Sequence, residues 1–545
     1  MSMLERAAAH RPFLPVSTPG ERTADRVLQW AQWQPHAPAV SDDTRALSYG
    51  ALADAIYAVA GQLRAEGLGP GERIMVIGEN SVALTVMLLA ASQCGVCAVV
   101  ENVRRMPAEI AGILAHSLPR KVFVIGASAE ARRHAEVLGA DPQHNTALGD
   151  FSVAVPSNAV SAATSDDTGP MPDDIAIIIY TTGTTGQPKG VMLTHSNLIF
   201  IAAMMRALRH LSPRDRVYGV LPATHVMGHA SVMLGALHNG AALHLVARFD
   251  AARCVATLTA QRITCIQGAP AMFASIAAYC RQQAATEAGG SASGRSAGMR
   301  CFPDVRFIGS GGAPIDATIK ADAEALFGCE LQNGYGLTEA ASICWTRFDD
   351  ANTDDNVGPP LPGVETCLRD SAGQTVGDGE VGELWMRGPN LMAGYFRNPE
   401  QTRRVVDAEG WFNTQDLARS LPDGRMLIVG RTKDVIVRSG FNVYPLEVEA
   451  ALNTHPAVLH SAVVGRSVPG NEEVVAYVEL AAAGSADAPA LAAHVAGLLS
   501  PYKRPAEIVI VPALPLAANG KVLKSQLAQV CGRPDHATQQ TGDRT

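Results

Sequence analysis

The chain has 545 residues, of which 47% are hydrophobic and 18% are charged, and its formal net charge is −8. Such a length usually exceeds what one hydrophobic core serves, so at least two domains are expected. The negative net charge argues against a nucleic-acid-binding protein, and anionic substrates would depend on locally placed Lys and Arg. Ten cysteines in so long a chain form no disulfide framework.

Two stretches near the N-terminus bear on localisation. Residues 1–14 contain charged side chains and no apolar run, so no signal peptide is predicted. Residues 82–100 are uncharged and long enough on paper to span a bilayer. Polar residues such as Gln93 lie inside this stretch and favour a buried helix followed by a short strand. We therefore expect a cytoplasmic protein without a membrane span.

Helices and strands alternate along the first part of the chain. The pattern predicts a strand at 39–40, a helix over 49–66, and strands over 73–77 and 122–125 on either side of the helix and strand of 82–100. This order is typical of helices that cover a largely parallel sheet. The expected fold is therefore α/β, with a large N-terminal domain of layered sheets and a β-rich subdomain.

A run rich in Gly and Thr, Tyr180 to Val191, follows the apolar strand predicted at 175–179. Its glycines let backbone N–H groups converge, its threonines donate hydrogen bonds, and Lys189 adds charge, so the run predicts a cradle for a polyphosphate. A Walker loop is excluded because Pro188 precedes Lys189 and a strand follows instead of a helix. A flexible surface turn is the alternative.

The next motif, residues 222–229, follows a strand predicted over 217–221. His225 and His229 have the spacing of two metal ligands on a helix, but Val226 stands where a zinc protease needs a glutamate, which disfavours a metal site. A hydrogen-bonded core histidine stays an alternative for His225.

Two further turns also follow predicted strands. Residues 309–314 offer backbone with few side chains, on which a flat ring can lie. Residues 333–339 combine an aromatic ring, a hydroxyl and the Glu339 carboxylate. A purely structural alternative is that Glu339 is a favourable negative charge at the N-terminus of a helix. Between the two earlier motifs and these turns, the Gly-, Ser- and Ala-rich stretch 282–298 is expected to be a loop.

The C-terminal part reads as a small α+β domain. We place the domain boundaries so that residues 1–430 form the N-terminal domain, 431–530 the C-terminal domain and 531–545 a disordered tail. Within the small domain, Asn519 and Gly520 supply a tight turn that projects Lys521.

In this order, the motifs resemble those of the adenylate-forming superfamily of acyl-CoA and aryl-CoA synthetases, peptide-synthetase adenylation domains and luciferases. The resemblance runs from about Arg22 to Leu527. It implies a two-step acid–thiol ligase that uses ATP, Mg²⁺ and coenzyme A. A small-molecule carboxylic acid, medium-chain fatty or aromatic, would first form an acyl-adenylate with release of pyrophosphate, and then an acyl-CoA with release of AMP.

The resemblance also implies roles for individual residues. Nucleotide binding is assigned to Thr181, Thr182, Gly183, Thr184, Thr185, Lys189, Gly311, Gly312, Ala313, Asn333, Gly334, Tyr335, Thr338, Asp416, Arg431, Asn442 and Lys521. Among these, Asp416 would bind the ribose, although Gln415 replaces the glycine usual before it. Catalytic roles are implied for Lys521, Glu339, Thr184 and His225, and Mg²⁺ binding for Glu339 and Thr184.

The remaining implied residues concern the acid and the thiol. The acyl pocket would be lined by His225, Met227, Ser231, Gly336, Ala341 and Ser342. Coenzyme A binding and the hinge between domains are implied for Arg248, Lys433, Ser439 and Gly440.

Three rival interpretations stay open. A stand-alone adenylation enzyme could load a carrier protein, although peptide-synthetase domains place an Asp where Val226 stands. A luciferase-like oxygenase would share every motif. A non-catalytic nucleotide-binding regulator is disfavoured because the charged motif residues are all retained. The sequence identifies neither the acid nor the oligomeric state, and a homodimer stays open.

Overall fold

The computed structural model describes residues 18–157, 174–182, 188–287, 301–315, 317–348, 356–438, 441–468, 471–516 and 522–531. The chain divides into two compact units. The first comprises Met1–Gly312, Ala321–Thr366 and Met386–Phe412, and the second comprises Ala313–Lys320, Cys367–Trp385 and Asn413–Thr545. Gly430, where we place the domain boundary, lies within β20 (Met426–Arg431) of the second unit.

One eight-stranded sheet of the first unit has the order β18-β9-β8-β4-β3-β5-β7-β6 in the described residues. Its strands are β3 (Arg73–Gly78), β4 (Cys97–Asn102), β5 (Lys121–Ile125), β6 (Asp141–Asn145), β7 (Gly149–Ala154), β8 (Ile175–Thr182), β9 (Pro188–Thr194) and β18 (Gly394–Tyr395). Strands β3, β4, β5 and β8 run parallel, as the alternating pattern predicts.

The uncharged stretch 82–100 forms the buried helix α4 (Val82–Cys94) and then β4, as predicted. Ser81 caps the helix by accepting a hydrogen bond from the Leu84 N–H, and Gly95 ends it with a left-handed φ of 74°. Across the part of the chain that the structure describes, no helix has both the length and the apolar character needed to cross a membrane.

A second eight-stranded sheet of the first unit has the order β15-β14-β13-β12-β10-β11-β1-β2 among the described strands. Its members are β1 (Pro38–Ser41), β2 (Ala46–Ser48), β10 (Arg216–Gly219), β11 (Ala242–Leu245), β12 (Cys265–Gly268), β13 (Phe307–Gly311), β14 (Leu331–Tyr335) and β15 (Cys344–Trp345). The strands from β1 to β14 in this order run parallel. The predicted layered α/β fold is confirmed.

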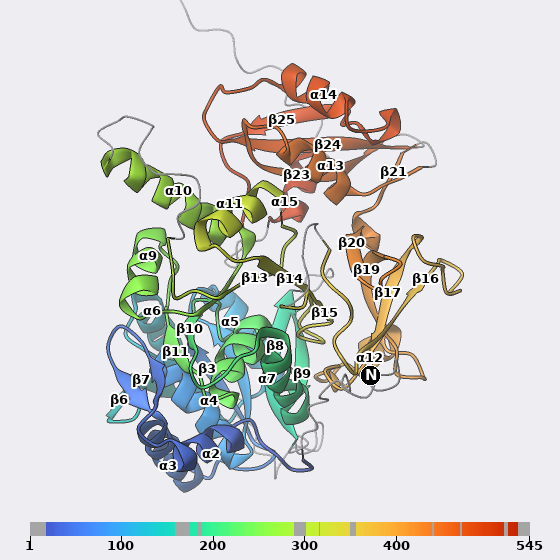
Figure 1. The fold of residues 1–545 in the computed structure, drawn as a ribbon. Coiled ribbons are helices and arrows are strands. Elements are labelled where there is room, and N and C mark those ends of the chain that lie inside the picture. The colour runs from blue at the N-terminus through green and yellow to red at the C-terminus, as the bar shows by residue number, and fades with distance from the viewer. Residues whose placement is uncertain are drawn as a thin grey trace, which may run out of the picture. The chain divides into compact units, whose positions relative to one another are not determined.

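Helices separate the strands in sequence, as Figure 1 shows. They are α2 (Asp25–Trp33), α3 (Tyr49–Ala65), α5 (Pro107–Ser117), α6 (Ala129–Leu138), α7 (His195–Arg209), α8 (Gly235–His238), α9 (Ala251–Ala260), α10 (Pro270–Glu287), α11 (Ala317–Phe327) and α12 (Pro399–Val405). Because α10 continues to Glu287, the loop predicted over 282–298 is wrong for its first six residues, where helix-forming Gln and Ala outweigh the missing periodicity. Residues 288–298 lie outside the described part.

The second unit contains the small α+β domain that the sequence predicts. A four-stranded sheet joins β16 (Glu365–Arg369), β17 (Val381–Arg387), β19 (Phe412–Ser420) and β20. The strands β21 (Ile436–Arg438), β22 (Phe441–Val443), β23 (Val458–Val468), β24 (Asn471–Leu480) and β25 (Glu507–Val511) follow with helices α13 (Pro445–Asn453), α14 (Ala488–Ala496) and α15 (Lys524–Cys531). Val448, Val463 and Leu491 belong to its hydrophobic core.

A buried histidine at the start of α7 makes the fold sensitive to acid. The His195 side chain is 4% exposed, and its Nδ1 accepts a hydrogen bond from the Thr23 N–H. Burial, reinforced by the nearby Arg22 guanidinium, lowers the pKa of His195 from 6.5 to about 3. The folded protein therefore holds this ring neutral where the unfolded chain protonates it.

We expect the free energy of unfolding to fall as the pH drops from 6.5 towards 3, because the unfolded state binds the extra proton in this interval. In His195→Gln the amide oxygen still accepts from Thr23, but no proton is taken up. The pH dependence should become shallower by up to about 1.4 kcal/mol per pH unit. Thermal unfolding midpoints between pH 7 and pH 4 measure this, with exposed His36→Gln as the control. Parallel curves for both variants and the parent would contradict the assignment.

Candidate active site

Two predicted ligand-facing turns meet at the carboxyl edge of the second sheet. Strands β13 and β14 pair in parallel with Gly311 opposite Gly334, so residues 311–312 and 333–335 lie side by side. The carboxyl ends of parallel strands are the usual place for a ligand in an α/β fold. A Cβ on Gly334 would lie 1.9 Å from Trp345 Cε3, so the indole of Trp345 lies against the backbone of β14.

The turn after β14 presents the predicted Glu339 carboxylate. Tyr395 Oη donates a hydrogen bond of 2.8 Å to Glu339 Oε1. The Lys189 ammonium lies 5.3 Å from the centroid of the same Tyr395 ring. Tyr395 therefore brings the predicted anion and the predicted cation of the nucleotide site to one aromatic side chain.

The chemistry of Glu339 fits a magnesium ion. Burial and the neighbouring Glu339 carboxylate raise the pKa of Tyr395, so its hydroxyl stays a hydrogen-bond donor and orients the carboxylate. Mg²⁺ is typically held by one or two carboxylates together with substrate phosphates. Among the described residues, no group of three or more His, Cys, Asp or Glu side chains is placed to hold a metal ion. Glu339 would hold Mg²⁺ jointly with nucleotide phosphate.

The run predicted to cradle phosphate is flanked by two paired strands. Strands β8 and β9 are antiparallel, with Thr181 opposite Lys189 and Thr182 opposite Pro188. The sequence predicts that the first strand ends at residue 179, but the pairing of β8 with β9 includes residues up to Thr182 and from Pro188. Both strands therefore extend further into the Gly- and Thr-rich run than expected. Gly183, Thr184 and Thr185 lie outside the described residues. Arg105 Nη2 donates to the Tyr180 carbonyl over 2.7 Å and holds the end of β8.

His225 precedes an uncommon helical turn. The π-helix η1 (Met227–Leu234) begins two residues after it and carries the predicted pocket residues Met227 and Ser231. His225 is therefore not on the helix that the two-histidine spacing suggests. His229 is buried, and its Nδ1 pairs with the Ala223 carbonyl over 3.1 Å. Burial lowers the pKa of His229 to about 4, so this ring is neutral.

The remaining pocket residues lie in a tight return after β14. A Cβ on Gly336 would lie 2.0 Å from the Ala341 carbonyl oxygen, so only glycine fits at Gly336. Ala341 has a left-handed φ of 56°. The Asn390 amide donates to the Ala340 carbonyl over 2.9 Å and to the Ser342 carbonyl over 2.6 Å, which fixes the return.

In the second unit, two predicted nucleotide residues form an ion pair. Asp416 Oδ1 lies 3.0 Å from Arg431 Nε across the β19–β20 ladder. Gln415 has a left-handed φ of 59°. Gln415 therefore adopts the left-handed backbone conformation that a glycine would adopt at this position. Its side chain makes that conformation strained.

Other predicted residues of the second unit lie on its exposed elements or outside the described part. Lys433 belongs to the short helix η2 (Thr432–Asp434), and Asn442 to β22. Ser439, Gly440 and Lys521 are outside the described residues. The flanks of the Lys521 turn pair as an antiparallel bridge between Leu516 and Val522.

Arg248 has partners within the first unit. Its Nη2 lies 2.6 Å from Glu130 Oε1, and its Nε lies 3.8 Å from Glu79 Oε2. A coenzyme A phosphate would have to compete with these carboxylates for the guanidinium, so its assignment stays a prediction.

Sequence comparison decides the family. The profile of the AMP-binding enzyme family matches residues 27–396, and that of the AMP-binding enzyme C-terminal domain matches residues 447–521. The chain belongs to the AMP-binding enzyme family. It is 33% identical over 511 residues to feruloyl-CoA synthase of Amycolatopsis sp., which covers 92% of this chain and 97% of that protein.

Other relatives agree with this membership. Sulfoacetate–CoA ligase of Cupriavidus necator is 32% identical over 502 residues, 91% of this chain and 95% of that protein. The crystal structure of a benzoate CoA ligase from Burkholderia xenovorans has a TM-score of 0.78 at 29% identity and covers 93% of this chain and 100% of that one. ATP-bound MatB from Rhodopseudomonas palustris has a TM-score of 0.79 at 27% identity and covers 93% and 98%.

This AMP-binding enzyme is therefore an acyl-CoA synthetase that works with ATP, Mg²⁺ and coenzyme A, as the motifs predict. The resemblance to the adenylate-forming superfamily is confirmed. The roles of its individual residues are developed as proposals below.

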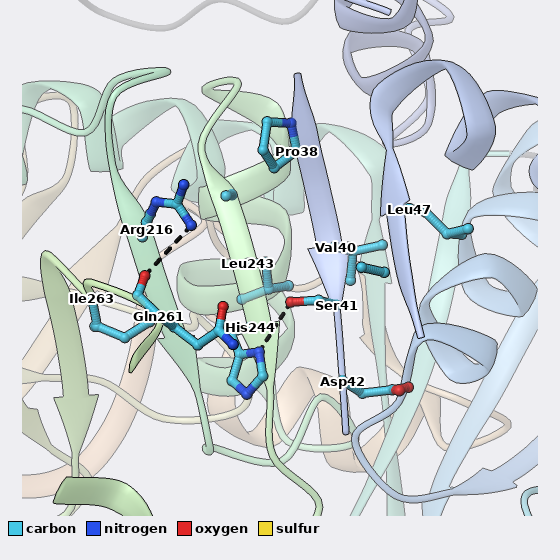
Figure 2. Close-up of a pocket in the computed structure, with 12 residues that line it drawn as sticks. Pro38, Val40, Ser41, Asp42, Leu47, Arg216, Leu243, His244, Gln261 and Ile263 are labelled. Atoms are coloured by element: carbon cyan, nitrogen blue, oxygen red, sulfur yellow. Dashed lines mark hydrogen bonds between the residues drawn. The ribbon is translucent and has the colours of Figure 1, made fainter. Parts of the chain in front are cut away.

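A cavity of about 270 Å³ lies elsewhere in this AMP-binding enzyme. Figure 2 shows Ser41, Arg216, His244 and Gln261 on its walls, with His244 Nδ1 and Ser41 Oγ 3.0 Å apart. Its lining runs along the strands, from Arg216 at the start of β10 to Ser41 and His244 near the carboxyl ends of β1 and β11. It contains none of the predicted site residues.

Three residues that position the site escaped sequence reasoning. They are Asn80, Asn390 and Tyr395. The Asn80 amide donates to the Gly219 and Leu221 carbonyls and thereby holds the segment that leads to His225. In the sequence, the one sign of such an anchor is a polar residue next to the end of a predicted strand. Many positions show this sign, so it does not single out Asn80. Tyr395 lies 56 positions from Glu339 along the chain, so no local pattern relates the two residues.

Tyr395→Phe tests whether the hydroxyl orients Glu339. A hydrogen bond to a charged group contributes about 1.5–3 kcal/mol, so we expect kcat/KM for pyrophosphate release to fall about tenfold or more. The Mg²⁺ concentration for half-maximal rate should rise, because the carboxylate is less ordered. Exposed Tyr57→Phe serves as the control. An unchanged Mg²⁺ dependence would show that Tyr395 does not act on the carboxylate.

Proposed function

We propose that this enzyme activates an aromatic or medium-chain carboxylic acid as its adenylate and transfers the acyl group to coenzyme A, with aromatic acids preferred. The preference is supported by relatives named for ferulate and benzoate.

In the first step, a carboxylate oxygen attacks the α-phosphorus of ATP, and the bond to the β-phosphate breaks with release of pyrophosphate. The two reacting oxyanions repel each other by roughly 5 kcal/mol at about 3.3 Å and an effective dielectric of about 20. Cations are needed to offset this repulsion. Lys189 beside Tyr395 is one candidate, and Lys521 in the Asn519-Gly520 turn is the other.

The carboxylate of Glu339 contributes in a different way. Held by Tyr395, it would bind Mg²⁺, which supplies positive charge at the phosphates when bound. In the second step, the coenzyme A thiolate attacks the acyl carbon, and AMP leaves with the bonding electron pair. His225, just before η1, is proposed to lie near the acyl group.

The arrangement of Lys189, Tyr395 and Glu339 is the observation that carries this proposal, because it gathers opposite charges where a phosphate and its metal would meet. Pyrophosphate release in the presence of ATP, Mg²⁺ and a panel of carboxylic acids tests it. Aromatic acids should give the highest kcat/KM. If no acid of the panel releases pyrophosphate above the acid-free background, the proposal is wrong.

Lys521→Ala tests the adenylation lysine. Loss of this cation should lower the rate of pyrophosphate release by at least about a hundredfold, as for removal of one transition-state donor. Conversion of a presynthesised acyl-adenylate to acyl-CoA should stay within a few-fold of the parent rate. Exposed Arg419→Ala, which removes another cation from the second unit, is the control. Equal losses in both half-reactions would contradict the role of Lys521.

A further inference from the structure

A fully buried arginine closes the end of α7 in the first unit. Arg209 is 3% exposed, and its guanidinium lies 4.5 Å from the centroid of the Trp345 ring and 5.3 Å from that of Phe307. Its Nη1 donates to Gln267 Oε1 over 2.6 Å and contacts the Ser231 carbonyl at 3.4 Å. These neighbours are aromatic rings or neutral dipoles.

No carboxylate among the described residues pairs with Arg209. Burial lowers the pKa of Arg209 to about 9. A guanidinium with this pKa is still charged at neutral pH. An isolated buried charge is costly, and buried charges in proteins are usually paired.

The hydrogen-bond partners missing around Arg209 are acceptors. Among the described residues, Arg209 Nε and Nη2, Gln267 Nε2 and Trp345 Nε1 are buried donors without a partner. The single unpartnered acceptor on the same sheet face is Gln332 Oε1, which lies in register with Gly309 beside Gln267. An unpaired buried donor destabilises the fold, so this cluster lacks a group rich in acceptors.

The cluster lies behind the residues predicted to hold the acid. Gln267 and Gln332 are level with Gly309, two residues before Gly311 along parallel strands, which is about 7 Å at the usual rise. A Cβ on Gly311 would lie 3.2 Å from Met227 Cε, so this face of β13 also faces η1. Ser231 of η1 is itself a contact of Arg209.

We propose that Arg209 and Gln267 bind a second, anionic oxygen group at the far end of the acid, so that the preferred substrate is a dianion with about 7 Å between its two acidic groups. A para-disubstituted benzoate or a dicarboxylate of similar length has this spacing. The proposal rests on the proposed function, because it places the reacting carboxylate at the carboxyl edge of the sheet. Arg209 would act as a specificity residue.

A purely structural role for Arg209 predicts a different outcome. There the guanidinium only supports the Trp345 ring, water satisfies the remaining donors, and the acid carries no second charge. The two interpretations differ in how removal of the charge affects matched acids, since loss of support would weaken the binding of all acids alike.

The experiment compares kcat/KM for pyrophosphate release with terephthalate and with 4-methylbenzoate. The parent enzyme should prefer terephthalate. Arg209→Met, which keeps much of the side-chain volume, should lower the terephthalate to 4-methylbenzoate ratio at least about 30-fold, as expected for loss of one partner of a buried charge pair. Arg209→Lys should retain part of the ratio, and Gln267→Met should lower it less than Arg209→Met does.

Arg206→Met is the matched control, because Arg206 lies on the same helix with its side chain exposed. It should leave the ratio unchanged. A parent preference for 4-methylbenzoate, or an equal loss for both acids in a folded Arg209→Met, would overturn the proposal, and the parent preference alone decides if that variant does not fold. The adipate to hexanoate ratio repeats the same test with an aliphatic spacer, and it should also fall in Arg209→Met. If none of these acids supports pyrophosphate release above the acid-free background, the proposed function itself is refuted.

Discussion

The hydrogen bond from Tyr395 to Glu339 ties the two large sheets of the first unit together at the candidate site. Tyr395 is carried by β18, which pairs with β9, one of the two strands that flank the predicted phosphate cradle, whereas Glu339 follows β14 of the other sheet. The Met392 N–H adds a second tie, to the Glu339 carbonyl over 2.7 Å. Charge placement in this enzyme therefore depends on how two sheets meet, and a shift of either sheet would separate Glu339 from Lys189.

Asparagine side chains provide the other ties across the same seam. Asn80, just after β3, donates to the carbonyl of the last residue of β10 and to the Leu221 carbonyl beyond it, and Asn102, at the end of β4, donates to Thr224 Oγ1 over 3.2 Å. Both anchors are short, so they leave little freedom to the segment before His225. Short polar anchors suit a site whose substrates are anions, because amides position backbone without adding further negative charge.

The fold was predictable because hydrophobic period and turn residues act locally. The strand β3 and the helix α4 with its Ser81 cap and Gly95 stop follow from such signals. The motifs also gave the right cofactors. What could not be predicted depends on long-range pairing: Tyr395 reaches Glu339 across 56 positions, and Trp345 covers Gly334 only because the chain reverses between them. The loop predicted over 282–298 is wrong for residues 282–287 for a local reason. Helix α10 continues through a stretch that lacks an amphipathic pattern.

Charge governs both the reaction of the acid and, in the proposal above, the selection of the acid by the group at its far end. A chain with a net charge of −8 repels anionic substrates at long range, and salt screens much of that repulsion. Selection among acids therefore has to come from charges at short range inside the protein. A cation at the surface would discriminate weakly, because water competes for both partners. Arg209, held between Trp345 and Phe307 away from water, interacts through a low effective dielectric, where a matching anion gains most and a neutral group leaves the charge unpaired. Burial of Arg209 without a charged partner destabilises the fold, and the same burial would make Arg209 selective for a second anionic group.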